Sequence, residues 1–151
     1  MENQDRNIPA VLISMTLAAT YSLFTLPVVV AGTVEDETAG EPVTVTIGAD
    51  GIQRLEIILD SYTFTPDYII VQSGKPVEFT LKNIASLAPH NFRIDAQEDN
   101  LLFDEDVKAG KSATVIFIPD KPGVYEFYCD KKLPFSASHR EKGMIGKLEV
   151  Q

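Results

Sequence analysis

Beyond residue 42, the hydrophobic residues fall in short runs of β-branched and aromatic side chains, and this pattern limits the fold more than any other feature. Turn-forming clusters at 73–76, 109–111 and 119–123 separate several runs, and no stretch keeps a helical period for more than a turn or two. The runs predict strands over residues 43–47, 55–59, 68–71, 77–82, 91–94, 113–118, 124–128 and 144–150. Seven or eight short strands in about 110 residues predict an all-β fold, a Greek-key β-sandwich. The acidic stretch 96–111 is predicted to be a loop or a short helix.

The N-terminal part is set apart by residues 8–32, a run of 25 residues without a charged side chain. About 20 apolar residues suffice to cross a bilayer. The run therefore predicts either a retained membrane anchor or a cleaved secretory signal, with a buried core helix as a third interpretation. Arg6 is the only basic residue before the run, a weak bias that places the C-terminal part outside the cytoplasm.

The predicted organisation has three parts. Residues 1–32 form a signal peptide or membrane anchor, residues 33–42 form an acidic linker, and residues 43–151 form one sandwich domain. We expect the protein to be periplasmic or otherwise extracytoplasmic, either soluble after cleavage or anchored to the membrane.

Charge and the scarce residue types exclude several functions. The chain has 13 basic and 22 acidic residues, a net charge of −9, which disfavours binding to the nucleic-acid backbone. Its single cysteine excludes an internal disulfide and a zinc site built from cysteine pairs. Two histidines are too few for a multi-histidine metal enzyme and leave little for a hydrolase triad. We therefore expect no enzyme and no nucleic-acid partner.

Four side chains that can bind a soft metal follow the N-terminal run: His90, Cys129, His139 and Met144. Cys129 closes one predicted strand, His90 precedes another, and a sandwich can bring such strand ends together. Two imidazoles and a thiolate form a strong trigonal set, and a thioether can bind at a longer axial distance, so the same ligands serve Cu(I) and Cu(II). Each residue alone would be interpreted as an ordinary core or structural residue. Their coincidence, with an unpaired cysteine in an exported protein, favours a copper site.

Three segments of the chain resemble the plastocyanin/azurin group of cupredoxins, the small type 1 blue copper proteins. They are residues 64–83 (FTPDYIIVQSGKPVEFTLKN), 89–95 (PHNFRID) and 123–150, which begins with GVYEFYC and ends with HREKGMIGKLEV. The resemblance covers about residues 55–151. It is specific, because it includes a His-Asn pair, a cysteine at a strand end, and a histidine followed five residues later by a methionine.

The resemblance implies a set of ligands and a supporting residue. One copper ion per chain would be bound by His90, Cys129 and His139, with Met144 as the weak axial ligand. Asn91 matches a family position that ties the two ligand loops together by hydrogen bonds, a role that tunes the metal.

The spacer between Cys129 and His139 departs from the family pattern. Nine residues (DKKLPFSAS) intervene, whereas plastocyanin-like and azurin-like members have two to four. This length is closer to the blue-copper loop of copper nitrite reductases, but those enzymes need further histidines, including one at the position of Tyr128. Asp130 stands where small members often carry a small residue. The departure leaves the geometry, colour and redox potential of the site open.

The long loop contains an apolar patch, Leu133-Pro134-Phe135, that we expect near the copper edge. Basic residues that would surround the patch are Lys131, Lys132, Arg140 and Lys142. Small transient interfaces commonly have an apolar centre and a charged rim, so the patch predicts a docking site for a redox partner. The alternative is that Phe135 packs on the sandwich and the basic residues are solvated. The acidic run 104–106 (Asp-Glu-Asp) is a second candidate docking surface or, alternatively, a solvated loop.

We therefore predict a mononuclear type 1 copper protein that carries single electrons between redox partners such as a cytochrome or an oxidase or reductase. His139 would be the exposed exit for the electron. We expect a monomer, which associates with a membrane if residues 8–32 are retained. The alternatives are a copper chaperone or storage protein, an accessory subunit of a membrane oxidase or reductase, and an interaction module that has lost its metal. A dinuclear copper site is excluded, because it needs two cysteines.

Overall fold

The computed structural model of the protein describes residues 40–96 and 101–151. The predicted signal or anchor at 1–32 and most of the predicted linker at 33–42 lie outside these residues. Across the two described ranges, no helix is long and apolar enough to cross a membrane. The three-part organisation therefore stays a prediction.

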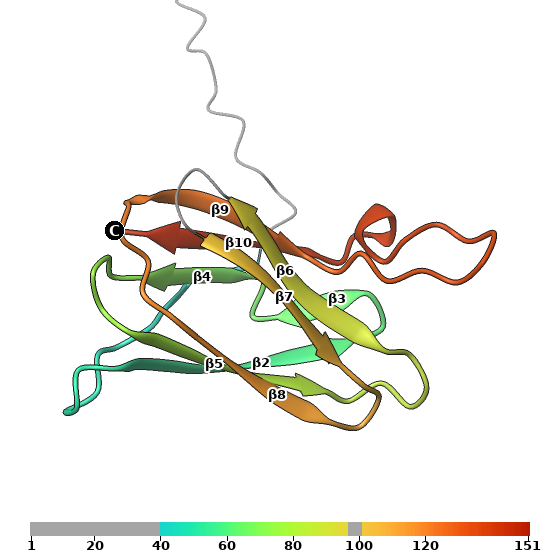
Figure 1. Cartoon of the computed structure of the whole chain (residues 1–151), viewed down its shortest axis with the longest axis horizontal. Helices are drawn as coiled ribbons and strands as arrows, with labels where there is room; N and C mark the ends of the chain where they lie inside the picture. The colour runs from blue at the N-terminus through green and yellow to red at the C-terminus, as the bar shows by residue number, and fades with distance from the viewer. Residues whose placement is uncertain (1–39, 97–100) are drawn as a thin grey trace, which may run out of the picture. The chain divides into compact units, whose positions relative to one another are not determined.

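The described residues contain two sheets that form the layers of a sandwich (Figure 1). The six-stranded sheet has the order β1-β4-β10-β9-β6-β7, and the four-stranded sheet has the order β3-β2-β5-β8. The strands are β1 (Val43–Thr44), β2 (Gln53–Asp60), β3 (Thr63–Thr65), β4 (Tyr68–Val71), β5 (Val77–Asn83), β6 (His90–Ala96), β7 (Leu101–Val107), β8 (Ser112–Phe117), β9 (Gly123–Tyr128) and β10 (Ile145–Val150). A short 3₁₀ helix, η2 (Arg140–Lys142), precedes β10. The all-β sandwich predicted from the sequence is confirmed.

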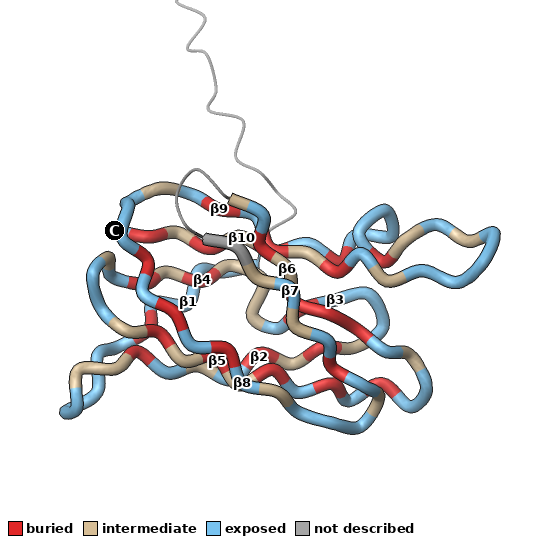
Figure 2. Tube along the Cα trace, in the orientation of Figure 1, coloured by how far each residue is buried: buried red, intermediate tan, exposed pale blue. Residues whose placement is uncertain are grey.

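Buried residues alternate with more exposed ones along most strands (Figure 2), and the buried side chains form the core between the two sheets. Phenylalanine rings from both sheets meet there. Phe92 and Phe127, on neighbouring strands of the six-stranded sheet, have ring centroids 4.9 Å apart. Phe79 of the four-stranded sheet lies 6.1 Å from Phe92. Each fully buried ring contributes roughly 1.5–3 kcal/mol through the removal of apolar surface from water.

The strand count differs from the prediction, since the described residues hold ten strands and not seven or eight. Part of the stretch 96–111, predicted as a loop or short helix, is the edge strand β7, which pairs antiparallel with β6. Acidic residues obscured its alternation, because Asp104 and Asp106 are exposed while Val107 is buried. The other unexpected strand, β3, has three residues, of which Phe64 alone is buried.

The sheet order brings the predicted metal-binding residues to one end of the sandwich. Strands β6 and β9 are antiparallel neighbours, with Arg93 opposite Tyr128, so the start of β6 lies beside the end of β9. On the other side of β9, Ile145 at the start of β10 pairs with Tyr128. The loop before β6 is held by Asn83, whose amide donates hydrogen bonds of 2.9 Å to the carbonyl oxygens of Ala88 and Val107. The chain segments around His90 and Cys129 are therefore fixed by the sheet.

Candidate metal centre

The structure brings His90, Cys129 and His139 together in a buried group. His90 begins β6, Cys129 follows β9, and His139 directly precedes η2. Their exposed fractions are 0%, 0% and 6%. The two Nδ1 atoms are 3.0 Å apart, and the Cys129 Sγ lies 3.7 Å from Nδ1 of His90 and 3.4 Å from Nδ1 of His139. One nitrogen from each ring therefore faces the sulfur.

These separations fit one metal ion between the three atoms. A first-row metal such as zinc binds imidazole nitrogen at about 2.0 Å and thiolate sulfur at about 2.3 Å. At bond angles between about 100° and 120°, such bonds place the nitrogens about 3.1–3.5 Å apart and the sulfur about 3.3–3.7 Å from each nitrogen. The observed distances agree to about 0.1 Å with these ranges. Two imidazoles and a thiolate are also the donor set that suits copper.

Burial sets the protonation of the three groups. It lowers the pKa of His90 to about 4, with a further lowering by His139, and it also lowers the pKa of His139, where Lys142 adds to the effect. Both imidazoles are therefore neutral at pH 7 and can offer a lone pair. Burial raises the pKa of the Cys129 thiol, against the backbone N–H groups of Asn91 and Lys131, which favour the thiolate. A metal must therefore displace the thiol proton when it binds.

Met144 lies next to this group along the backbone. Its side chain is fully buried. Its N–H donates to the carbonyl oxygen of His139 at 2.9 Å, and its own carbonyl oxygen accepts the N–H of Cys129 at 3.1 Å. Met144 is thus held between two of the three residues, and its role as an axial ligand stays a prediction.

Asn91 links the two ligand-bearing segments, as the family resemblance implies. Its backbone N–H points at Cys129 Sγ at 3.4 Å. Its side-chain oxygen accepts the N–H of Asp130 at 3.1 Å, and its amide donates to Asp104 at 2.6 Å and to Asp130 at 3.0 Å. Asp130, the departure noted in the sequence, therefore completes this link. Arg93 extends it, since its guanidinium lies 3.2 Å from carboxylate oxygens of both Asp104 and Asp130.

The nine-residue spacer is closed at its base. The N–H of His139 donates to the carbonyl oxygen of Lys131 at 2.8 Å, so the residues between them leave the sheet and return to the same place. Glu141 accepts hydrogen bonds from the backbone N–H and the hydroxyl of Ser138, at 2.6 Å and 2.8 Å, and this fixes the turn at His139. The extra length is thereby accommodated without moving His139 away from Cys129.

The apolar patch of the loop points into solvent. Leu133 is 70% exposed and Phe135 is fully exposed. The alternative in which Phe135 packs on the sandwich is therefore wrong. Exposed Leu87, from the loop before β6, is another large apolar side chain near the start of a ligand-bearing strand.

Several charged residues of the predicted basic rim and the predicted acidic surface form ion pairs. Lys131 forms an ion pair with Asp106 at 2.5 Å, and Arg140 pairs with Glu126. Arg140 also lies 4.1 Å over the ring of Tyr128. One ion pair therefore joins the two candidate surfaces, so they are not separate fields of opposite charge.

His139 is not the exposed exit predicted from the sequence, because it is 6% exposed. The ring of Tyr62 lies against it, with centroids 4.8 Å apart and planes at 71°. Sequence reasoning missed Tyr62, since a Ser-Tyr pair carries none of the Gly or Asn that usually marks a two-residue turn.

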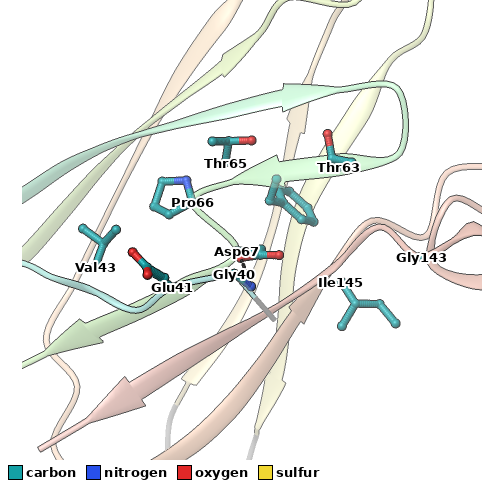
Figure 3. A pocket seen from close by; sticks show the side chains of 10 residues that line it. Gly40, Glu41, Val43, Thr63, Thr65, Pro66, Asp67, Gly143 and Ile145 are labelled. Atoms are coloured by element: carbon teal, nitrogen blue, oxygen red, sulfur yellow. Dashed lines mark hydrogen bonds between the residues drawn. The ribbon is translucent and has the colours of Figure 1, made fainter. Parts of the chain in front are cut away.

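A pocket of about 470 Å³ lies beside Gly143 and Ile145 (Figure 3). It is lined by residues 63–67, by residues 40, 41 and 43, and by Gly143 and Ile145, the neighbours of Met144. Its lining contains two carboxylates, Glu41 and Asp67, and no histidine or cysteine. Asp67 is already used to accept the N–H of Gly40 at 3.0 Å. The metal-binding chemistry of the described residues therefore lies at the His90–Cys129–His139 group.

A β-sandwich with a buried His-Cys-His group that could bind copper is the class of protein that this fold and site define. Comparison with known families agrees: residues 23–145 match the cupredoxin-like domain, and the chain belongs to that family. No curated protein matches the chain in sequence.

Several solved structures share the fold. The metal-binding domain of the Cu(I)-exporting P-type ATPase CopA of Streptococcus pneumoniae D39, determined with Cu(I), is 23% identical, with a TM-score of 0.55, over 74% of this chain and 96% of that chain. Reduced auracyanin from Roseiflexus castenholzii is 19% identical, with a TM-score of 0.53, over 65% and 96%. A multi-copper oxidase from Pediococcus acidilactici is 14% identical, with a TM-score of 0.57, over 73% of this chain and 28% of that chain.

Proposed function

We propose that this protein binds one copper ion through His90, Cys129 and His139, with Met144 as a weak axial ligand, and carries single electrons between redox partners outside the cytoplasm. The observation that carries the proposal is the convergence of two imidazole nitrogens and one thiol sulfur on one buried point, from the start of β6, the end of β9 and the loop that follows β9. Copper held by this donor set would supply a one-electron couple, because soft sulfur suits Cu(I) and imidazole suits Cu(II).

The surrounding residues support a carrier because they keep the ligands in place. The N–H of Asn91 is directed at the sulfur, and its side chain ties the Cys129 segment to β6. The hydrogen bonds of Met144 to Cys129 and His139 join the two remaining segments. Ligands that are held by such a network rearrange little when the charge at the metal changes, and a small rearrangement favours rapid electron transfer.

The partner would dock at the ligand-bearing end of the sandwich. Leu87, Leu133 and Phe135 are 91%, 70% and 110% exposed, and all three lie in loops that adjoin ligand residues. Exposed apolar side chains on loops beside the ligands favour transient association with another protein. The protein itself would act as a monomer.

Transfer or storage of copper is the second candidate function. It is favoured by the likeness to the metal-binding domain of the CopA exporter, a structure that contains Cu(I). A third candidate, an accessory subunit of a membrane oxidase or reductase, depends on whether residues 8–32 are retained as an anchor. The first two differ in chemistry: a carrier needs a stable, reversible Cu(I)/Cu(II) couple, whereas a chaperone must release copper readily.

The test is a visible absorption spectrum of the full chain in mild detergent, titrated with Cu(II). The proposal predicts an intense sulfur-to-copper band that saturates at one copper per chain and is absent in Cys129→Ser. Circular dichroism should show that this variant keeps its strands. Voltammetry of the loaded protein should then show a reversible one-electron couple. An intense band without a reversible couple would favour copper transfer, and no band at all would overturn the copper-thiolate site.

A further inference from the structure

Tyr62 occupies a backbone conformation that tyrosine disfavours. It lies in the two-residue turn between β2 and β3, where Asp60 pairs with Thr63. Ser61 and Tyr62 both have positive φ angles, 31° and 70°. Two-residue hairpin turns with two positive φ angles favour Asn and Gly, because a Cβ atom crowds the backbone in the left-handed region. A strained residue of this kind indicates a role beyond the turn itself.

The side chain of Tyr62 reaches from the four-stranded sheet to the loop that carries His139. Its ring contacts the imidazole edge-on, with centroids 4.8 Å apart. On the same ring, Lys142 Nζ lies 4.5 Å from the centroid and donates a hydrogen bond of 3.3 Å to the hydroxyl. Tyr62 is 37% exposed, whereas His139 beneath it is 6% exposed. The tyrosine ring therefore covers part of His139 and faces solvent itself.

We propose that Tyr62 is a positioning residue, which covers His139, fixes the orientation of its imidazole and slows the loss of copper from the site. The inference rests on the proposed copper site. An edge-on aromatic contact can hold the imidazole plane without competing for its nitrogen lone pair. Lys142 holds the tyrosine ring in turn, so the loop and the turn fix each other. Removal of partners that orient a metal ligand typically changes metal affinity about 10- to 100-fold.

The first experiment measures copper release from the full chain loaded with Cu(I), after addition of excess bathocuproine disulfonate. Tyr62→Gly suits the positive φ and so relieves the turn, but it uncovers His139. We expect release to accelerate about 10- to 100-fold in this variant, whereas Tyr62→Phe, which keeps the ring, stays close to the original rate. Urea unfolding of each variant shows whether the fold is retained.

The chain offers a matched control at Tyr68. Lys147 Nζ lies 4.6 Å from the centroid of the Tyr68 ring, as Lys142 does for Tyr62, but Tyr68 bonds Glu149 through its hydroxyl. Tyr68→Ala should therefore leave copper release unchanged. An unchanged rate in Tyr62→Gly, or equal acceleration in Tyr68→Ala, overturns the proposal.

The second experiment needs no copper and so separates this proposal from the proposed function. Diethyl pyrocarbonate modifies accessible histidines, and mass spectrometry of the metal-free chain gives the rate at each of the two. In Tyr62→Gly, His139 should react several-fold faster, while the fully buried His90 stays slow. If His139 reacts at an unchanged rate, the proposal that Tyr62 covers His139 is wrong, even if copper binds normally. If His139 reacts faster but the chain binds no copper, the covering role of Tyr62 is supported and the proposed copper function is wrong.

Discussion

The two histidines of the metal centre are held in different ways. His90 begins a strand, and the adjacent Asn91 is hydrogen bonded to the Cys129 segment through both its backbone and its side chain. His139 lies in a loop and is held by a backbone hydrogen bond to Lys131, by the N–H of Met144 and by the ring of Tyr62. We call these the strand-borne and loop-borne halves of the site.

Because the two halves are held differently, we expect them to control different properties of the protein. The strand-borne half is made of core strands, so a change there alters the stability of the whole sandwich. The loop-borne half returns to the sheet through few contacts, and local structure of this kind can open without global unfolding. We therefore expect variants in the first half to lower the free energy of unfolding, and variants in the second to change mainly the retention of copper.

The largest effect on the free energy of unfolding is expected for Gly146→Ala. Gly146 lies in β10 opposite Phe127. A Cβ atom there would overlap the phenyl ring of Phe127 and come 2.8 Å from the carbonyl oxygen of Asp67. The phenyl ring cannot move aside easily, because it is packed against Phe92. Overpacking of this severity should lower the free energy of unfolding by about 3 kcal/mol. Urea denaturation of the metal-free chain measures the change, and a loss well below about 1 kcal/mol would contradict a rigid strand-borne half.

Acid should destabilise the metal-free protein chiefly through His90. Its pKa is about 4 in the folded state, against about 6.5 in an unfolded chain, so the unfolded state binds more protons between these values. The contribution of neutral His90 to the free energy of unfolding is therefore present above about pH 6.5 and is lost as the pH falls towards 4. The total loss is about 3 kcal/mol.

The comparison of two variants sharpens this expectation. His139 also has a lowered pKa, but the lowering at the fully buried His90 is the large one. Denaturation between pH 7 and 4.5 should therefore show a weaker pH dependence in His90→Gln than in His139→Gln. The reverse order would mean that the loop-borne histidine is the more tightly coupled to the fold.

Much of the strand-borne half could be predicted from the sequence. The position of Cys129 directly after β9 places the cysteine at a strand end, and the His-Asn pair at 90–91 identifies its neighbour. The loop-borne half could not be predicted in the same way. The cover over His139 comes from Tyr62, 77 residues earlier in the chain, through a turn that lacks the usual turn residues.

Charge was a second source of error. The acidic residues of β7 hide its alternation because they occupy the exposed positions of an edge strand. Their partners, Arg93 and Lys131, come from β6 and from the ligand loop. Such pairing depends on tertiary contacts, so runs of one sign in the sequence gave no indication that an ion pair joins the two predicted surfaces.

Asn91→Ala tests whether the link between the two strands supports both stability and the metal. Three side-chain hydrogen bonds of a fully buried amide would be lost, at about 0.5–1.5 kcal/mol each, so we expect a net loss of about 2 kcal/mol. Gln53 is the matched control, since its buried amide bonds the backbone of Gln72. Gln53→Ala should cost a similar stability and leave the absorption spectrum of the copper-loaded protein unchanged, whereas Asn91→Ala should shift it. Identical spectra would contradict a role for Asn91 at the metal.

The smallest effect on stability, and the clearest test of the comparison, is expected at Gly143. This residue ends η2 with a φ of 97°, and its N–H donates to the backbone carbonyl oxygen of Arg140 at 2.9 Å. An added Cβ would meet nothing within 4 Å, so Gly143→Ala costs only the backbone strain of the left-handed region, about 1 kcal/mol. Gly74, in the turn between β4 and β5 away from the site, has a φ of 66° and equally open surroundings.

The two alanine variants should therefore lose similar stability but differ at the metal. In Gly143→Ala the strain is relieved by movement of the segment that joins His139 to Met144, so copper release to a chelator should accelerate. In Gly74→Ala the release should keep its original rate, because the backbone hydrogen bonds of this turn go to Pro119 and Gln151, which are not ligands. If both variants release copper at the original rate, the loop-borne half is as rigid as the strand-borne half, and the division of the site into two halves is wrong.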